Sequence, residues 1–326
     1  MRLLALMLLL WPVAALADAP EGLLLPLDCE PGVDCWILRY VDHDPGPGGR
    51  DYACGKLTGE GHKGTDFAIP DLAAMVAGVE VRAAAAGVVD AVRDGMPDQP
   101  LDPDNREAIG GRSCGNGIRL DHGDGWTTWY CHLRRGSLMV QEGDRVAAGQ
   151  TMALVGLSGE TIFPHLHFDL RQGDRPVDPF VGTAEPQGCA PGAQPLWRAD
   201  VMAALTYRPV ALVNAGIAPT APKAEDARRG YHDRTGLAVT SRVLELWVEG
   251  YWVEAGDRVQ FTLTGPDGAP VVSHTVELDR SWVSWFQFVG ARRPGAAWPA
   301  GTYVGEVTLQ RDGIAPVGLE RSVELR

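Results

Sequence analysis

The sequence lacks several features that define whole classes of protein. No apolar run approaches the roughly 20 residues that a membrane-spanning helix needs, and there is no internal repeat and no long low-complexity tract. Positive charge is scarce: 29 Lys and Arg residues stand against 42 Asp and Glu residues, for a formal net charge of -13. Such a surface disfavours nucleic acid and anionic lipid as partners. What the chain does have is 326 residues, 45% of them hydrophobic, which is enough for packed cores in two domains.

The longest apolar run lies at the start of the chain. One arginine precedes eight apolar residues, Leu3–Leu10, which are followed by Pro12 and an A-x-A sequence that ends at Ala17. This order is typical of a secretory signal peptide, which we predict to be residues 1–17. Cleavage there leaves no stable membrane span and a periplasmic or secreted protein. The alternative is an uncleaved membrane anchor.

The six cysteines suit an exported chain. Their number is even, so three disulfides are expected in an oxidising compartment. None of them has the C-x-x-C spacing of a cysteine zinc site. Six cysteines allow 15 pairings; in the set that we favour, one pair is near in sequence and another flanks a predicted hairpin. The favoured pairs are Cys29–Cys35, Cys114–Cys131 and, by elimination, Cys54–Cys189.

Turn residues and alternating apolar residues divide the chain into two β-rich domains. Residues 18–50 are a Pro/Gly/Asp-rich lead-in, 51–182 the first domain, 183–230 a Pro/Ala-rich linker with one short helix, and 231–326 the second domain. Regular short strands with turns between them predict an immunoglobulin-like β-sandwich for the second domain. The expected fold is therefore mostly β, with the sandwich at the C-terminal end.

The strongest local signal in the first domain is a hairpin. Gly117–Asp121 and Trp126–His132 are predicted strands joined by a Gly-containing turn, and His165–Arg171 is a further predicted strand. The polar, Pro- and Gly-rich segment 94–113 should be a long surface loop. Such loops are often functional; the alternative is a tolerated insertion.

Three short patterns suit a metal site. His62 and Asp66 are four residues apart in a turn that enters a strand, and His165 and His167 share one face of a strand because side chains alternate with period two. His132 ends the hairpin strand. Zinc accepts imidazole nitrogen and carboxylate oxygen, and three protein ligands plus a water form the catalytic arrangement. A lone histidine is more often a satisfied surface or core residue, but the combination within about 105 residues predicts a zinc site.

The segments GHKGTDFAIP, YCHL and PHLHFDL, in that order, resemble the three motifs of the LytM/lysostaphin-type peptidases, family M23. The resemblance extends over about residues 55–180 and implies an antiparallel β-sheet catalytic domain. It implies one zinc ion per chain, bound by His62, Asp66 and His167. It also implies that His132 and His165 are catalytic: they lie beside the water that zinc activates, orient and deprotonate it, and stabilise the tetrahedral intermediate.

The chain departs from the usual family pattern in three places. Cys131 precedes His132 where a small residue such as alanine is more familiar, Ile162 and Phe163 stand where a small pair is more familiar, and the 94–113 loop is longer. Every implied ligand and catalytic position is nevertheless present. We therefore expect an active site whose groove wall, and hence specificity, differs from that of relatives.

Two further features have two interpretations each. Asp169 shares the strand face of His165 and His167, and is either an acceptor that orients a histidine or a charge at the groove rim, which we favour. Trp282 and Trp285 are three residues apart, so they face opposite sides of a strand. At least one should lie in the core; a glycan-binding platform is the alternative.

The function implied by the resemblance is that of an exported zinc endopeptidase, which hydrolyses peptide bonds in peptidoglycan stem peptides or cross-links. Peptidoglycan peptides are then the expected partners. Two alternatives remain open at this point. One is a non-catalytic wall-binding or regulatory protein that activates another cell-wall hydrolase, and the other is an extracellular peptidase that acts on protein substrates.

Overall fold

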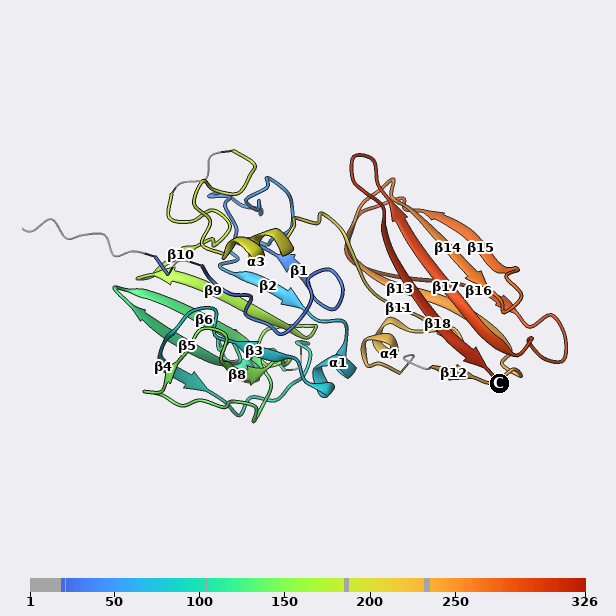
Figure 1. Cartoon of the computed structure of the whole chain (residues 1–326), viewed down its shortest axis with the longest axis horizontal. Coiled ribbons are helices and arrows are strands. Elements are labelled where there is room, and N and C mark those ends of the chain that lie inside the picture. Colours follow the sequence, from blue (N-terminus) through green and yellow to red (C-terminus); the bar gives the residue numbers. More distant parts are fainter. Residues whose placement is uncertain (1–18, 21, 104, 185–187, 232–234) are drawn as a thin grey trace, which may run out of the picture.

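The computed structural model describes residues 19–20, 22–103, 105–184, 188–231 and 235–326. Two β-rich units lie along the long axis of the molecule (Figure 1), and the predicted signal peptide lies outside the described residues. None of the helices in the described part of the chain has the length and apolarity that crossing a bilayer requires. The helices are short: α1 (Leu72–Ala77), α2 (Arg106–Ile109), α3 (Ala199–Ala204) and α4 (Ala224–Arg228). The prediction of a mostly β fold is confirmed.

The first unit is built on an eight-stranded sheet in the order β1-β2-β9-β6-β5-β4-β7, with β10 paired to β9. A small second sheet joins β3 to β8. The predicted hairpin is β5–β6, and the predicted strand at the H-x-H sequence is β9. The strand bounds are β1 (Trp36–Arg39), β2 (Thr65–Ala68), β3 (Glu80–Arg82), β4 (Gly87–Arg93), β5 (Asn116–Gly123), β6 (Trp126–Leu133), β7 (Arg145–Val146), β8 (Thr151–Leu154), β9 (His165–Gln172) and β10 (Arg175–Val177).

The central strands of this sheet bury one face and leave the other for chemistry. Leu166, Phe168 and Leu170 of β9 and Tyr130 of β6 are buried in the main core of the unit. Because strand side chains alternate, the histidines of β9 point to the opposite face. The period-two pattern thus separates the core from the candidate site.

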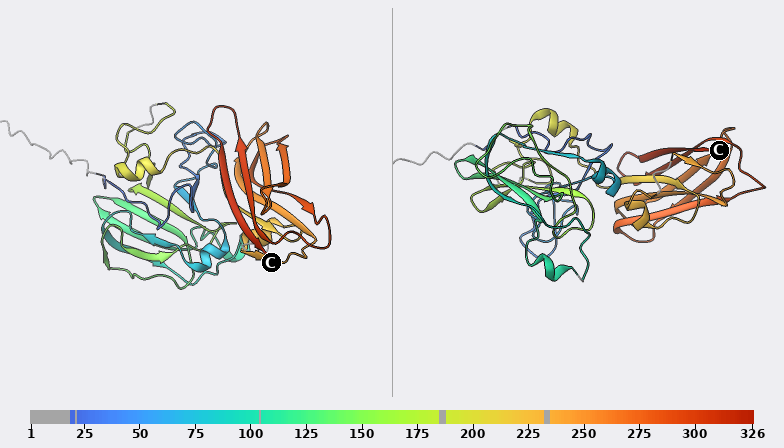
Figure 2. Two further views of the ribbon diagram at one scale, coloured as in Figure 1. Left: turned by 45° about the vertical axis from the view of Figure 1, so that its right-hand side comes forward. Right: turned by 90° about the horizontal axis from the view of Figure 1, so that it is seen from below.

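The second unit consists of two sheets around their own core (Figure 2). One sheet has the order β11-β13-β16 and the other β12-β18-β17-β14-β15; the neighbours are antiparallel except β12 and β18. Of the paired tryptophans, Trp285 is buried in this core, whereas Trp282 is 40% exposed, with the guanidinium of Arg280 over its ring. The bounds are β11 (Ala211–Ala218), β12 (Gly236–Leu237), β13 (Val243–Val253), β14 (Arg258–Thr264), β15 (Pro270–Glu277), β16 (Trp282–Arg292), β17 (Gly301–Gln310) and β18 (Val317–Leu325).

The segments before and after the first predicted domain belong to the two units. Within the predicted lead-in, β1 pairs with β2, and Leu23, Leu27 and Tyr40 enter the main core. Within the predicted linker, β11 pairs along its length with β13. The three favoured disulfides are confirmed. Cys29–Cys35 lies within the predicted lead-in and Cys114–Cys131 within the first predicted domain, whereas Cys54–Cys189 joins that domain to the predicted linker.

The two units contact each other through an apolar cluster. It combines residues of β1 and β2 with residues of β11 and β13, and it includes Trp36, Leu38, Val213 and Tyr251. Polar bonds border it: the Trp252 indole Nε1 donates to the Leu38 carbonyl at 2.7 Å. Burial of this apolar surface holds the second unit against the first sheet.

Candidate functional site

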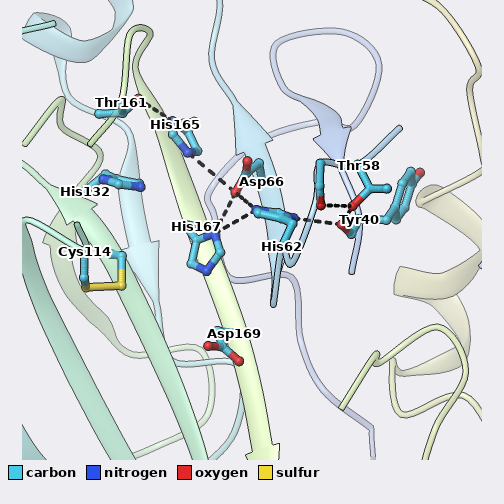
Figure 3. A network of polar contacts seen from close by, with 12 residues as sticks. Tyr40, Thr58, His62, Asp66, Cys114, His132, Thr161, His165, His167 and Asp169 are labelled. Atoms are coloured by element: carbon cyan, nitrogen blue, oxygen red, sulfur yellow. Dashed lines mark hydrogen bonds and ion pairs between the residues drawn. A yellow bond between two sulfur atoms is a disulfide. The ribbon is translucent and has the colours of Figure 1, made fainter. Parts of the chain in front are cut away.

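Three side chains that are distant in sequence converge at the open face of the first sheet. His62 precedes β2, Asp66 lies on β2, and His167 lies on β9 directly opposite Asp66 in the antiparallel register. Asp66 Oδ1 is 3.1 Å from His62 Nε2 and 2.8 Å from His167 Nδ1, and the two nitrogens are 3.2 Å apart (Figure 3). The structure therefore brings together the three residues predicted as metal ligands.

The donor set fits zinc. Ligands about 2.1 Å from a tetrahedral zinc ion are about 3.4 Å from one another, close to the separations in this cluster. The His62 Nδ1–H donates to the Tyr40 carbonyl at 2.8 Å, which leaves Nε2 free as a metal ligand. Gly64 gives the room: a Cβ there would lie 2.8 Å from His167 Nε2. A larger residue at position 64 would displace that imidazole.

The charges in the cluster favour an ionised Asp66. Burial by itself raises the pKa of this carboxyl, but the nearby charge of His62, followed by that of His165 and by hydrogen bonds from His165 and His167, holds its pKa well below the usual range. Burial lowers the pKa of His62, yet the charge and hydrogen bond of Asp66 outweigh it, so the His62 pKa is raised. A divalent cation can take the place of the protons that this carboxylate attracts.

His132 and His165 face the cluster from the other side. Their rings are 4.6 Å apart, both side chains are buried, and His165 Nε2 is 3.5 Å from Asp66 Oδ1. His132 Nδ1–H donates to the Ser158 carbonyl at 2.7 Å, and His165 Nδ1–H donates to the Phe163 carbonyl at 3.0 Å. The bond to Ser158 assigns the tautomer of His132, so that the Nε2 atom of this ring carries a lone pair.

The environment of His132 keeps it neutral. Burial, followed by the charges of His165 and His167, lowers its pKa well below the usual value. Its backbone also has φ = 62°, a left-handed conformation that is uncommon outside glycine. Strained backbone of this kind is often found at functional sites, where the surrounding structure maintains it.

A groove of about 700 Å³ surrounds these residues. The 94–113 loop contributes Leu101 to its wall and is bound there, since Leu101 N donates to the Thr161 carbonyl at 2.7 Å. Phe163 stacks on the His165 ring at 4.6 Å, with the rings 30° from parallel. Two of the three departures from the family pattern, the longer loop and the bulky residue before Pro164, thus shape the groove.

The groove also contains residues that the sequence analysis missed or misread. Asp169 is only 2% exposed and pairs with Arg171, so its interpretation as a rim charge was wrong. Trp129, opposite Asp169 in the sheet, lies between the guanidiniums of Arg119 and Arg171, about 5.0 and 5.1 Å from its ring. Trp129 and Cys131 are two residues apart on β6 and therefore share one face. This spacing could have identified Trp129 as a groove residue. Arg39 also lines the groove, but nothing in its local sequence indicates that position.

Comparison with known proteins places this site within a family domain. The model of peptidase family M23 matches residues 60–179. The chain is 32% identical over 117 residues to the peptidoglycan DD-endopeptidase ShyA of Vibrio cholerae, a match that covers 36% of this chain and 22% of that protein. It is 31% identical over 120 residues to the DD-carboxypeptidase/endopeptidase Mpg of Neisseria meningitidis, again covering 36% and 22%.

The chain thus spans about a fifth of the length of these curated relatives. Among solved structures, a zinc containing peptidase from Vibrio cholerae is 26% identical, covers 44% of this chain and 39% of its own, and has a TM-score of 0.29. The matched residues include every position of the three motifs, so residues 60–179 are similar to the peptidase family M23 domain.

Proposed function

We propose that the chain is an exported zinc endopeptidase that hydrolyses peptide bonds in peptidoglycan stem peptides or cross-links. The observation that carries the proposal is the convergence of three metal-binding atoms with two buried imidazoles in one groove. The names of the matched relatives, a DD-endopeptidase and a DD-carboxypeptidase/endopeptidase, support a peptidoglycan substrate. A complete set of groups for catalysis favours an enzyme over a purely regulatory protein.

In this proposal His62 Nε2, Asp66 Oδ1 and His167 Nδ1 hold one zinc ion. When bound, zinc supplies Lewis acidity: it polarises the scissile carbonyl and lowers the pKa of a water to about 7. The bond from His62 Nδ1 to the Tyr40 carbonyl fixes the orientation of that ring. Gly64 keeps the space beside His167 open.

The two buried imidazoles do the proton chemistry. A neutral His132, with its Nδ1–H bound to the Ser158 carbonyl, has Nε2 free to accept the proton of the attacking water. The ring that takes the proton becomes a donor and stabilises the negative charge that develops on the carbonyl oxygen. It then passes the proton to the nitrogen of the leaving amine, which completes the hydrolysis.

Export and domain organisation belong to the same proposal. A signal peptide at 1–17 and three disulfides fit a periplasmic or secreted protein. We infer a lead-in at 18–50, a catalytic domain at 51–182, a linker at 183–230 and an immunoglobulin-like domain at 231–326. Two strands of the structure extend that division: β1 adds the lead-in to the first unit, and β11 adds residues of the linker segment to the second.

The test is digestion of purified peptidoglycan sacculi by the zinc-loaded mature protein, with mass spectrometry of the released fragments. We expect new amino termini within peptide cross-links or stems, and none when a chelator is present. A matched control is His274→Ala, which removes an exposed histidine of β15 far from the groove residues. Intact sacculi after incubation with the zinc-loaded protein would contradict the proposal, and stimulation of a separate hydrolase under the same conditions would favour the regulatory alternative.

A further inference from the structure

Arg39 is a cation without a partner at the edge of the groove. It is half-buried, lines the groove, and makes no hydrogen bond or ion pair with any other residue in the described part of the chain. The chain has 42 acidic residues against 29 basic ones, so it has more than enough carboxylates to pair with every cation, yet none pairs with Arg39 in the described part of the chain. Arg171, which also lines the groove, is paired with Asp169. Partial burial removes some of the water around this unpaired guanidinium, so a ligand that pairs with it would be stabilised at this position.

A β-bulge turns Arg39 toward the site. The register pairs Ile37 with Phe67 but Arg39 with Asp66, so Leu38 is an extra residue on β1. In an unbroken ladder Arg39 would share the face of Ile37, which packs on the main core. The bulge instead places Arg39 on the face of Asp66, since an extra residue reverses the alternation beyond it.

The second unit holds this bulge in place. The Trp252 Nε1–H donates to the carbonyl of the extra residue, Leu38, at 2.7 Å, and the Leu38 side chain is buried in the cluster between the units. Trp252 itself has φ = 59°, and its carbonyl accepts a hydrogen bond from Arg311 at 2.8 Å. Arg39 is therefore positioned by the lead-in and by the second unit, both outside the residues that match the family, 60–179.

Arg39 stands in line with the proposed zinc ligands. The registers align Arg39, Asp66, His167 and Cys131 in one row across β1, β2, β9 and β6. Neighbouring strands are about 4.8 Å apart, so Arg39 is one strand from Asp66 and two from His167. A peptide advances about 3.3 Å per residue when extended. A group bound to Arg39 would therefore lie within one or two residues of a peptide bond at the zinc site.

We propose that Arg39 binds a free carboxylate of the peptide substrate, one or two residues from the scissile bond. The planar guanidinium matches a carboxylate with two parallel hydrogen bonds, and a carboxylate is the anionic group that a peptide itself carries. The enzyme would then prefer peptides with a free carboxylate at this position over the same peptides with a carboxamide. The inference rests on the proposed peptidase function.

The experiment compares two synthetic cross-linked peptidoglycan peptides. They differ only in the group proposed to bind Arg39: one peptide has a free carboxylate beside the scissile bond, and the other has a carboxamide in its place. We expect zinc-loaded wild type to favour the carboxylate peptide by about 10-fold or more in kcat/KM, mainly through KM. Arg39→Gln should remove this preference, because it lowers kcat/KM for the carboxylate peptide far more than for the carboxamide peptide, and Arg39→Lys should retain part of it. Arg145→Gln, which removes an exposed charge of β7, is the matched control.

A second measurement separates this inference from the proposed function. Isothermal titration of the same peptides into metal-free protein should show binding of the carboxylate peptide that Arg39→Gln weakens about 10-fold. If wild type cuts neither peptide, the proposed function fails, and the titration still decides the role of Arg39. Equal losses on both peptides in Arg39→Gln, or equal binding of both by wild type, would overturn the inference. Thermal melts of Arg39→Gln and Arg39→Lys serve as the folding control. Melting temperatures equal to that of wild type exclude misfolding as the cause of weaker binding.

Discussion

Asp66 of the first unit and two buried carboxylates of the second unit differ in the cations that surround them. In the second unit, Asp257 pairs with Arg311 through two bonds of 2.7 Å, and Glu249 pairs with Arg228. In the first unit, Asp66 is as deeply buried but lies among imidazoles instead of a guanidinium. A guanidinium is always charged, so it neutralises its carboxylate permanently. Imidazoles exchange protons near neutral pH, so Asp66 can trade them for a metal ion. The difference separates a carboxylate that stabilises the fold from one available for chemistry.

Removal of the Asp66 carboxylate should have the largest effect, because we propose that this carboxylate binds the metal, whereas those of the second unit stabilise the fold. In Asp66→Ala we expect zinc binding to be lost and cleavage to fall by at least about 10³-fold, because Asp66 would be one of the three ligands that hold the zinc, and zinc would supply the activation of the attacking water. Elemental analysis of the purified variant and a cleavage assay measure both effects. Asp257→Asn is the contrasting variant: it should lower stability and keep zinc. Full zinc occupancy in Asp66→Ala would show that the carboxylate is not a ligand.

His132→Ala tests the role of the neutral imidazole of His132. We expect kcat to fall by about 10²- to 10⁴-fold, the usual contribution of a general base or oxyanion donor, while zinc occupancy is unchanged. The readouts are single-turnover cleavage and metal content, and His274→Ala again serves as control. A variant that loses zinc together with activity would make His132 a ligand or a support of the ligands instead.

Arg228→Ala should affect the second unit alone. It leaves Glu249, which is 2% exposed, buried without its partner, and we expect a loss of about 2–3 kcal/mol in the free energy of unfolding, since Arg228 itself is partly exposed. Burial already raises the pKa of Glu249. The double variant with Glu249→Gln should recover part of the loss in urea denaturation. Zinc content should stay unchanged, and a drop in zinc would mean that the two units are coupled more tightly than their contacts indicate.

The smallest effect concerns pH. The pKa of His132 is lowered in the folded protein, so below about pH 6.5 the unfolded chain binds a proton at this residue that the folded chain does not. This residue therefore lowers stability as pH falls from about 6.5 toward its folded pKa. We expect the urea midpoint of metal-free wild type to fall relative to that of metal-free His132→Asn as the pH is lowered over this range. A difference that is flat with pH, or that rises on acidification, would contradict the burial of a neutral imidazole.

Local patterns predicted much of the first unit. The H-x-H sequence and the hairpin depend on side-chain alternation within one strand or two adjacent ones, and both appear in β9, β5 and β6. The strand β11 escaped prediction because all of its residues are buried, so that it shows no alternation. The strand β18 does alternate, with Val317, Leu319, Val323 and Leu325 on one side, and this signal could have been read.

The sequence by itself determined which chemistry is present: the histidines, the aspartate and the cysteine pairs Cys29–Cys35 and Cys114–Cys131 are set by residue type and by short spacings. Only the tertiary structure decided what surrounds them. The direction of Arg39 depends on a bulge in β1 that is bound by a tryptophan more than 200 residues away, and the burial of Asp169 depends on the packing of neighbouring strands. Short-range spacing is encoded in adjacent letters, whereas a one-residue shift in register or a contact between units arises from the summed packing of the whole chain.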